Sequence, residues 1–366
     1  MIQWREGTVE GVRARWPGAT ELDVAVTGHD GGTIPALAYT DLVGEPKPGD
    51  RVLLNVAALE LGLGTGGMAL VVAIPDALPP DPPQGPGHIV KARYTPLQTV
   101  VLGVDEQESP HHGILSEATG LEGMPVIVAD LHSAVPAILA GLREAAPQAR
   151  VAYVMTDGGA LPIAFSRTVA GLCDAGWLSG TVTVGQAFGG DLEAVNVHTG
   201  LLAAALVLRA DLAIVAQGPG NLGTDSPWGF SGVASGEAVN AISVLGGRAI
   251  ASLRVSEADE RGRHRGISHH SLTAYGRVAM AAADLPVPLL GGDFGERVLA
   301  QARELVLQSA GRLRFHEVET GGLVQALASS PVRLSTMGRA LDQDEASFVS
   351  AAAAGRFAAT VLAHSS

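Results

Sequence analysis

One short segment, residues 254–271, concentrates most of the side chains in this sequence that could do chemistry. It contains four arginines and three histidines, His264, His269 and His270, within eighteen residues. Ser268 is a favourable N-cap and predicts a helix whose first turn carries His269 and His270. Because a helix N-terminus disfavours imidazolium, we expect these rings to be neutral, the form in which imidazole binds metals or accepts protons.

Three interpretations of these histidines are open. In the first, they bind a divalent metal, since imidazole nitrogen and carboxylate oxygen suit zinc, manganese or iron, and the site could be completed by Asp259, Glu257, Asp130 and His132. In the second, they form an anion or acid–base site, and Asp130 and His132 share in the catalysis. In the third, the segment is a surface loop. Its spacing matches no established metal motif, unlike His-Glu-x-x-His on a helix.

Polar side chains also follow successive predicted strands, where glycines are frequent. Because open α/β sheets bind ligands beyond the carboxyl ends of their strands, we expect these side chains to line one cleft. Arg254, Arg263 and Arg265 would hold the carboxylate or phosphate of a ligand. The residues expected to orient that ligand are Asp157, Gln186, Asp191, Glu193 and Asn221.

Other motifs carry less information. The loop at 105–112 combines carboxylates with imidazoles and suits a site or a solvated loop equally. Residues 218–223 match the spacing G-x-G-x-x-G, but no helix follows at once. A glycine-rich lid that contains Trp228 and Phe230 is therefore favoured over a dinucleotide fingerprint. The sequence has no nucleophile elbow, and nothing around Ser166 marks it as a nucleophile.

The chain is expected to form two domains joined by a linker. Residues 75–87 contain six prolines and predict a semi-rigid, extended connection. Residues 1–74 show short alternating strands between glycine-rich turns, which predicts a small all-β, barrel-like domain. In residues 88–366, apolar strands alternate with amphipathic helices. This rhythm predicts an α/β domain with a largely parallel, doubly wound sheet and helices on both faces.

The expected elements of the α/β domain follow from these patterns. The strands are placed at 100–104, 126–129, 151–156, 181–184, 212–216, 249–255, 288–290, 312–317 and 332–336. The helices are placed at 133–146, 161–175, 192–209, 237–245, 271–283, 294–309 and 345–363.

Composition restricts the function classes. A formal net charge of −13 argues against binding to nucleic acids or anionic membranes. The single cysteine, Cys173, excludes an intramolecular disulfide and a cysteine metal centre, and its apolar helical surroundings predict that it is buried. No signature for NAD, an ATP P-loop, haem or an iron–sulfur cluster is present, which leaves a divalent metal as the cofactor to test. The sequence shows neither a signal peptide nor an uninterrupted membrane-length apolar run, so a cytoplasmic protein is expected.

Three longer motifs resemble an uncharacterised bacterial family, known as domain of unknown function 3866. They read YVMTDGGALP at 153–162, TVGQAFGGDLEAV at 183–195 and HRGISHHS at 264–271. The resemblance extends from the N-terminal barrel to the segment at 336–339, nearly the whole chain. It implies a bacterial, cytoplasmic protein and brings no activity or catalytic residues with it.

Two functional hypotheses of different classes follow. The leading one is an enzyme that acts on a small, polar, anionic metabolite by metal-dependent or histidine and aspartate acid–base chemistry. The alternative is a non-catalytic metabolite sensor whose N-terminal barrel contacts a partner. A structural oligomerisation protein explains the polar strand ends least well, although a homo-oligomer is compatible with either hypothesis.

Overall fold

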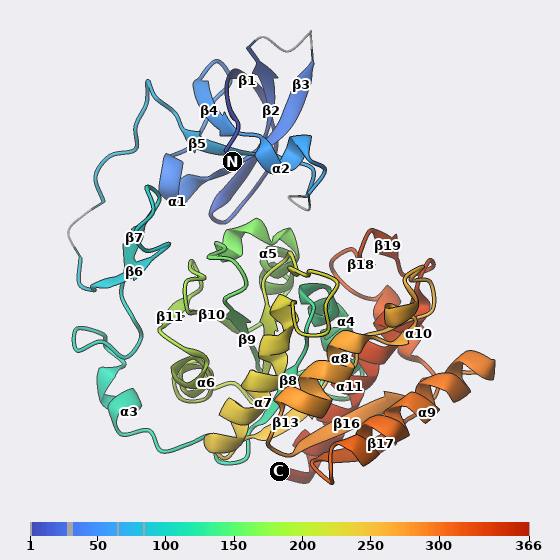
Figure 1. Cartoon of the computed structure of the whole chain (residues 1–366). Helices are drawn as coiled ribbons and strands as arrows, with labels where there is room; N and C mark the ends of the chain where they lie inside the picture. The colour runs from blue at the N-terminus through green and yellow to red at the C-terminus, as the bar shows by residue number, and fades with distance from the viewer. Residues whose placement is uncertain (1, 28–31, 64–65, 83–84, 366) are drawn as a thin grey trace.

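The computed structural model describes residues 2–27, 32–63, 66–82 and 85–365. Its N-terminal strands close into a five-stranded barrel in the order β1-β2-β3-β5-β4. Inward-facing residues alternate along β2, where Leu22 and Val24 are fully buried, as expected for a small barrel core. The predicted barrel-like domain is therefore confirmed (Figure 1). Its elements are β1 (Trp4–Trp16), β2 (Ala19–Val26), β3 (Thr33–Tyr39), α1 (Thr40–Val43), β4 (Arg51–Asn55), α2 (Ala57–Glu60) and β5 (Ala69–Ala73).

The second domain is built on an eight-stranded sheet in which every pairing is parallel, in the order β11-β10-β9-β12-β8-β13-β16-β17. Side chains of neighbouring positions in the central strand β8 enter opposite cores: Val126 and Val128 lie in one and Ile127 in the other. The prediction of a parallel sheet buried on both faces is confirmed. The strands are β8 (Pro125–Val128), β9 (Val151–Thr156), β10 (Gly180–Val184), β11 (Leu192–Ala194), β12 (Leu212–Gln217), β13 (Arg248–Ala251), β16 (Ala283–Pro288) and β17 (Leu313–Val318).

Helices cover the sheet in two layers (Figure 1). One core contains residues of α4 (Val135–Ala145), α5 (Arg167–Asp174), α10 (Leu323–Ala328) and α11 (Glu345–Ser365). The other core contains residues of α6 (Val197–Leu206), α7 (Ala234–Val244), the π-helical turn η5 (Ala274–Val278) and α9 (Gly292–Gln308). The short helix α8 (His269–Thr273) runs directly into η5.

The strand order creates a crevice at the carboxyl ends of β8 and β12. These two strands are neighbours, but the helix after β8 is α4 and the helix after β12 is α7, which pack on opposite faces of the sheet. Chains that leave adjacent strands toward opposite faces open a space between them, which is where open α/β proteins bind ligands. The strand order alone thus predicts that the candidate site lies between the ends of β8 and β12.

The C-terminal helix α11 packs closely on α4. A Cβ added at Gly355 would lie 1.9 Å from the carbonyl oxygen of Ile138, and one added at Gly141 would lie 1.9 Å from that of Ala352. Only glycine permits this approach, because the obstructing atoms are backbone. Residues Glu345–His364 form one helix long and apolar enough to cross a membrane, but most of it is buried against α4 and the sheet, as in a core helix.

Several predicted element boundaries are wrong. Residues 100–104 do not start the main sheet: β7 (Thr99–Val101) pairs with β6 (Ile89–Lys91) in a separate hairpin. The helix expected at 192–209 begins with strand β11, because Val104 and β10 supply it with strand partners. The helix expected at 161–175 is reduced to α5, which starts only after Ser166 caps it.

Three further boundaries are shifted. The strand expected at 288–290 is β16, which ends at Pro288, so the helix expected at 271–283 must end before it. Of residues 332–336 only β18 (Ser335–Thr336) is a strand, paired in a small hairpin with β19 (Arg339–Ala340). Cys173, expected to be buried, is half-buried at the surface of α5.

The barrel contacts the α/β domain at the segment that precedes α5. The indole Nε1 of Trp16 donates a 2.6 Å hydrogen bond to the carbonyl oxygen of Ala164, and Arg167 pairs with Glu21 at 3.3 Å. Gly18 lies against the same segment, where an added Cβ would meet the Ala164 methyl at 2.8 Å. The two domains therefore share a contact that depends on a few residues.

We expect residues 88–366, expressed alone, to fold, because both cores of the α/β domain are made of its own residues. The measurement is a cooperative thermal melt of the soluble fragment by circular dichroism. An insoluble fragment, or one without a cooperative transition, would show that the barrel belongs to the main core.

Candidate functional site

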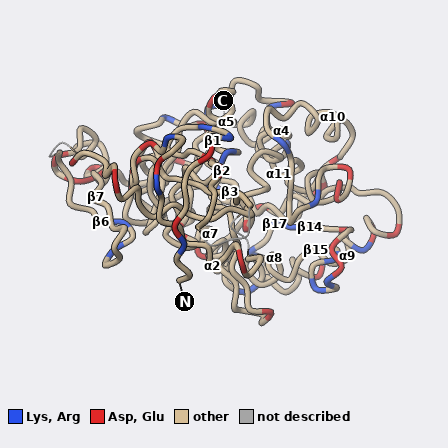
Figure 2. The backbone as a smooth tube through the Cα atoms, turned by 90° about the horizontal axis from the view of Figure 1, so that it is seen from above, with Lys and Arg blue, Asp and Glu red and all other residues tan. Residues whose placement is uncertain are grey.

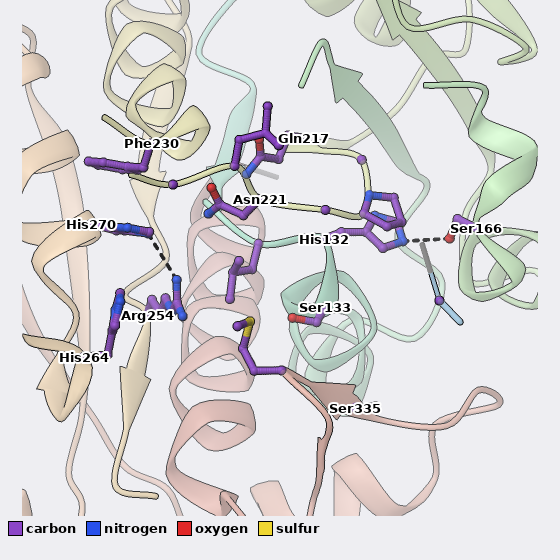
Figure 3. Close-up of a pocket in the computed structure, with 18 of the residues that line it drawn as sticks. His132, Ser133, Ser166, Gln217, Asn221, Phe230, Arg254, His264, His270 and Ser335 are labelled. Atoms are coloured by element: carbon purple, nitrogen blue, oxygen red, sulfur yellow. Dashed lines mark hydrogen bonds between the residues drawn. The ribbon is translucent and has the colours of Figure 1, made fainter. Parts of the chain in front are cut away.

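A cavity of about 720 Å³ lies beyond the carboxyl ends of β8, β12 and β13 (Figure 3). The carboxyl ends of all three strands contribute to it: His132 and Ser133 follow β8, Gln217 ends β12 and Asn221 follows it, and Arg254 follows β13. The barrel also reaches this cavity through Gly66 and Met68, which lie among its lining residues. The crevice predicted from strand order is therefore a real cavity in the structure.

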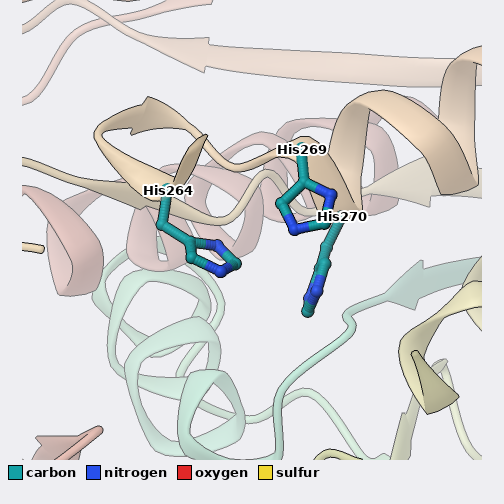
Figure 4. A group of neighbouring side chains, drawn as sticks. All are labelled: His264, His269 and His270. Atoms are coloured by element: carbon teal, nitrogen blue, oxygen red, sulfur yellow. The ribbon is translucent and has the colours of Figure 1, made fainter. Parts of the chain in front are cut away.

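Three histidines gather on one wall of the cavity. His264, His269 and His270 each offer a ring nitrogen within 4.8 Å of the other two (Figure 4). Ser268 holds this arrangement: its Oγ accepts a hydrogen bond from the backbone N–H of His270 and lies 2.8 Å from Nδ1 of His264. The helix start predicted at Ser268 is confirmed. Three imidazole nitrogens this close could hold one transition metal ion if they approached one another slightly.

The pKa values of two of these rings, His264 and His269, favour the neutral form. Burial, followed by the charges of Arg254 and Arg261, lowers the pKa of His264 to about 3. Burial also lowers the pKa of His269, followed by the charge of His270. For His269, which was expected to be neutral because of the helix N-terminus, the dominant effect is loss of solvent.

Behind the histidines, Asp130 is almost completely buried and incompletely paired. Its Oδ2 lies 3.5 Å from Nδ1 of His270 and 3.7 Å from Nη1 of Arg254, and it has no hydrogen-bond partner among the described residues. Arg254 Nη1 instead lies 3.1 Å from Nδ1 of His270. A buried carboxylate oxygen without a partner is costly, which indicates that another state of this site supplies one.

Two amide side chains on the same cavity are also incompletely paired. Oε1 of Gln217 and Nδ2 of Asn221 are buried and have no partner, although the other end of each amide is bonded, Gln217 to the carbonyl of Asp130 and Asn221 to Ser231. Of the five buried side-chain atoms without a partner in the described part of the chain, three therefore belong to this region. A polar ligand would satisfy such a cluster.

Asp259, expected among the metal ligands, is held elsewhere. Its carboxylate accepts hydrogen bonds from the backbone N–H and the guanidinium of Arg261, and a weaker contact from Arg339. These side-chain hydrogen bonds from Arg261 lower the pKa of Asp259 below its usual range. Among the described residues, the histidine group contains no carboxylate. Arg261, which binds the Asp259 carboxylate in place of a metal, lies only two residues further along the chain.

The arginines expected to hold the ligand are distributed differently. Arg254 and Arg263 line the cavity, and Arg263 pairs with Asp225 at its rim. Arg265 is exposed and is not among the lining residues. Arg261 does line the cavity, although it was not expected in the site. Three arginines therefore line the same cavity as the histidines, and two of them, Arg261 and Arg263, are paired with Asp259 and Asp225.

The residues expected to orient the ligand divide into two groups. Asn221 lines the cavity. Asp157 instead accepts hydrogen bonds from the backbone of Gly159, Ala160 and Gln186 and stabilises a turn. The Oε1 of Gln186 accepts from the N–H of Arg93, away from the cavity. Asp191 bonds to Thr181, and Glu193 bonds to Thr183 and the buried Lys91, so both are committed to the sheet edge at β10 and β11.

The glycine-rich loop after β12 contributes an aromatic ring. Phe230 is buried and stacks on His270 with ring centroids 3.9 Å apart and planes within 1° of parallel, whereas Trp228 is exposed. The loop was expected to form a lid, and in the structure Gly220, Gly223 and Gly229 line the cavity. Stacking fixes the plane of the His270 ring and so the direction of its nitrogens.

On the opposite wall, His132 is part of a buried hydrogen-bond chain. Its Nδ1 lies 3.1 Å from the hydroxyl of Tyr153, and its Nε2 lies 2.7 Å from Oγ of Ser166 (Figure 3). Burial lowers the pKa of His132 to about 4. His132 thus lines the same cavity as the three clustered histidines, but its ring bonds to Tyr153 and Ser166 instead of to them.

We expect His132 to make the protein sensitive to acid. Its pKa is about 4 in the folded chain and about 6.5 when unfolded, so the unfolded state binds the extra proton between these values. Stability should fall as the pH drops from about 6.5 to 4, by up to about 3 kcal/mol from this residue. The measurement is urea unfolding against pH for the native chain and a His132→Gln variant. Parallel stability curves for the two proteins would contradict this assignment.

The chain is defined by a barrel docked on a doubly wound α/β domain, with a cavity lined by histidines and arginines at the strand ends. It belongs to the family described as "Protein of unknown function (DUF3866)", whose model matches residues 35–355. The match begins in β3 of the barrel and ends in α11, so it covers part of the barrel and most of the α/β domain, and it confirms the resemblance seen in the sequence. No curated protein and no solved structure matches the chain.

Proposed function

We propose that this chain is a metal-dependent enzyme that acts on a small anionic metabolite in the cavity beyond β8, β12 and β13. The observation that carries the proposal is the group His264, His269 and His270, whose ring nitrogens lie within 4.8 Å of one another beside Asp130, whose Oδ2 has no hydrogen-bond partner among the described residues. Three protein nitrogens leave a coordination position open, as catalytic zinc sites do.

The carboxylate of Asp130 fits the role of orienting one of the histidine ligands. A histidine that binds a metal through Nε2 carries its proton on Nδ1 and donates it to a carboxylate or carbonyl. In His270, Nδ1 faces both Arg254 at 3.1 Å and Asp130 Oδ2 at 3.5 Å. Metal ligation would turn the Nδ1–H of His270 toward Asp130 and release the guanidinium of Arg254 for an anionic ligand. Asp130 is then a positioning residue for His270.

The charges around the cavity favour an anionic ligand. Arg254, Arg261 and Arg263 all line it, although the chain as a whole carries a formal net charge of −13. Figure 2 shows Lys and Arg interspersed with Asp and Glu along the chain. A bound metal polarises a carbonyl or phosphoryl oxygen or activates water, and the guanidinium groups hold the charged end of the substrate.

The test is metal content. We expect protein purified without a histidine tag to bind about one zinc, manganese or iron ion per chain, by elemental analysis and by calorimetric titration of the chelator-treated protein. Orthophosphate should then bind more tightly to the metal-loaded than to the metal-free protein. Protein that stays metal-free after incubation with all three ions would contradict the metal site.

The alternative is a metabolite sensor with the same cavity. The observation that favours it is the barrel, since Gly66 and Met68 extend the cavity wall into a second domain. A sensor would bind the ligand of the enzyme hypothesis and release it unchanged. Incubation of the metal-loaded protein with phosphate and carboxylate ester panels, followed by mass spectrometry of the small molecules, separates the two because only the enzyme forms products.

A further inference from the structure

The hydrogen-bond chain on the second wall of the cavity fixes the position of each proton. The hydroxyl of Tyr153 lies 3.2 Å from the carbonyl oxygen of Ala216 and 3.1 Å from that of Gln217, which can only accept. Tyr153 therefore donates to a carbonyl and accepts from His132 Nδ1–H. This leaves Nε2 of His132 without a proton, so the hydroxyl of Ser166 donates to it across 2.7 Å. The proton of Ser166 already points at a base.

Ser166 also lies where negative charge would be stabilised. It is the N-cap of α5, and its Oγ accepts from the N–H of Val169 at 3.0 Å. The next two N–H groups, those of Arg167 and Thr168, donate no hydrogen bond to any described residue, as is usual in the first turn of a helix. Both residues line the cavity with Ser166. Two free donors beside a serine are the arrangement that stabilises an oxyanion.

The surroundings of Ser166 hold it in place and leave it within reach of a ligand. Ser166 lies in the walls of both the 720 Å³ cavity and a second cavity of about 410 Å³ between the barrel and α5. Trp16 of the barrel fixes the segment just before it through the carbonyl of Ala164. The barrel thus holds the loop that carries this serine.

From this geometry we infer that Ser166 is a nucleophile, with His132 as its general base, for a small ester or related acyl compound bound in the same cavity. Oγ of Ser166 would form a bond to the acyl carbon as its proton passes to His132 Nε2. The carbon–oxygen bond to the leaving group breaks, and the alcohol takes that proton. Water, deprotonated by His132, then releases the carboxylic acid and restores Ser166.

The third member of this group differs from that of a serine hydrolase triad. Tyr153 orients His132 as the aspartate of a triad does, but it carries no charge to stabilise imidazolium. Burial raises the pKa of the Tyr153 hydroxyl, so the tyrosine stays neutral. We therefore expect acylation to be slow compared with a triad enzyme, and a covalent probe to detect it better than turnover.

The experiment is labelling of the full chain with diisopropyl fluorophosphate in the presence of a chelator, so that the outcome does not depend on the metal site. Ser166 Oγ attacks phosphorus, fluoride leaves and the serine proton reaches solvent through His132. We expect one diisopropylphosphoryl group per chain by intact mass, located on Ser166 by peptide mapping. An unlabelled native chain, or a label on another residue, overturns the inference.

Matched variants separate chemistry from folding. Ser166→Asn keeps an acceptor for the Val169 N–H and so the helix cap, but should not be labelled. His132→Gln keeps the hydrogen bond without a base and should slow labelling by at least about 100-fold. Ser133→Ala changes a serine on the same cavity whose hydroxyl, among the described residues, bonds to Thr336 and to no histidine, and it should label at the native rate. An unchanged rate in His132→Gln would show that the dyad is only structural.

Discussion

Replacing His269 by alanine should lower the affinity for a transition metal by at least about 100-fold. Loss of a group outside the coordination sphere typically costs about 10–100-fold, and His269 would be a direct ligand. Its ring is half-exposed and lies beside the rings of Phe230, His264 and His270, so its removal should leave the fold intact. Calorimetric titration of zinc into the chelator-treated protein measures the change.

The control for this experiment is His198→Ala. His198 is exposed on α6, far along the chain from the cavity, and its loss should not change zinc binding. An Asp130→Asn variant should fall between the two, with affinity lowered about 10–100-fold, because the amide could accept from His270 but would not carry the charge that strengthens the ligand. Equal zinc affinity in the His269 variant and the native chain would remove the metal proposal.

Replacing Gly355 by valine should unfold the α/β domain or lower its stability by more than about 3 kcal/mol. The added side chain would begin 1.9 Å from the Ile138 carbonyl oxygen, in the middle of the α4–α11 contact. Since the obstructing atom is backbone, no rotamer change relieves the overlap and the helices must separate. Such a loss is a large part of the stability of a typical domain. Chemical denaturation or the soluble yield measures it.

Gly113→Ala is the matched control for this helix glycine. Gly113 lies in the short helix α3 (His112–Ser116), and an added Cβ there would meet no atom within 4 Å. This variant should be neutral or slightly more stable, by up to about 1 kcal/mol, because alanine favours the helix. A Gly355→Val protein as stable as the Gly113→Ala protein would show that α11 does not pack on α4 as described.

The fold followed from the sequence because its signals are local. Apolar runs such as 151–156 and 212–216, each followed by an amphipathic segment, define parallel strands whatever their order in the sheet. The order itself, with β12 between β8 and β9, depends on packing between segments far apart in the chain. At β11 the local pattern predicted a helix, but Val104 and β10, which come from elsewhere in the fold, pair with this segment as a strand.

The site could be predicted only in part, for the same reason. The histidine group lies within seven residues, so Ser268 and its helix made it visible in the sequence. The Ser166–His132 pair spans 34 residues and has no local signature, because the fold alone brings the two side chains together. Asp259 failed as an expected ligand because its neighbour Arg261 binds it first, a competition that spacing does not reveal.

The docking of the barrel has a thermodynamic consequence. Gly66 and Met68 line the cavity, so a molecule held there would contact the barrel and the α/β domain at once. Any ligand that binds only the docked arrangement adds its binding free energy to the association of the domains, about 2.7 kcal/mol at a concentration one hundred times its dissociation constant. By reciprocity, whatever pulls on the barrel from outside would weaken ligand binding by the same amount. A partner that contacts the barrel would then act through the interface near Trp16 and Ala164 and change the fraction of protein that holds a ligand in the cavity.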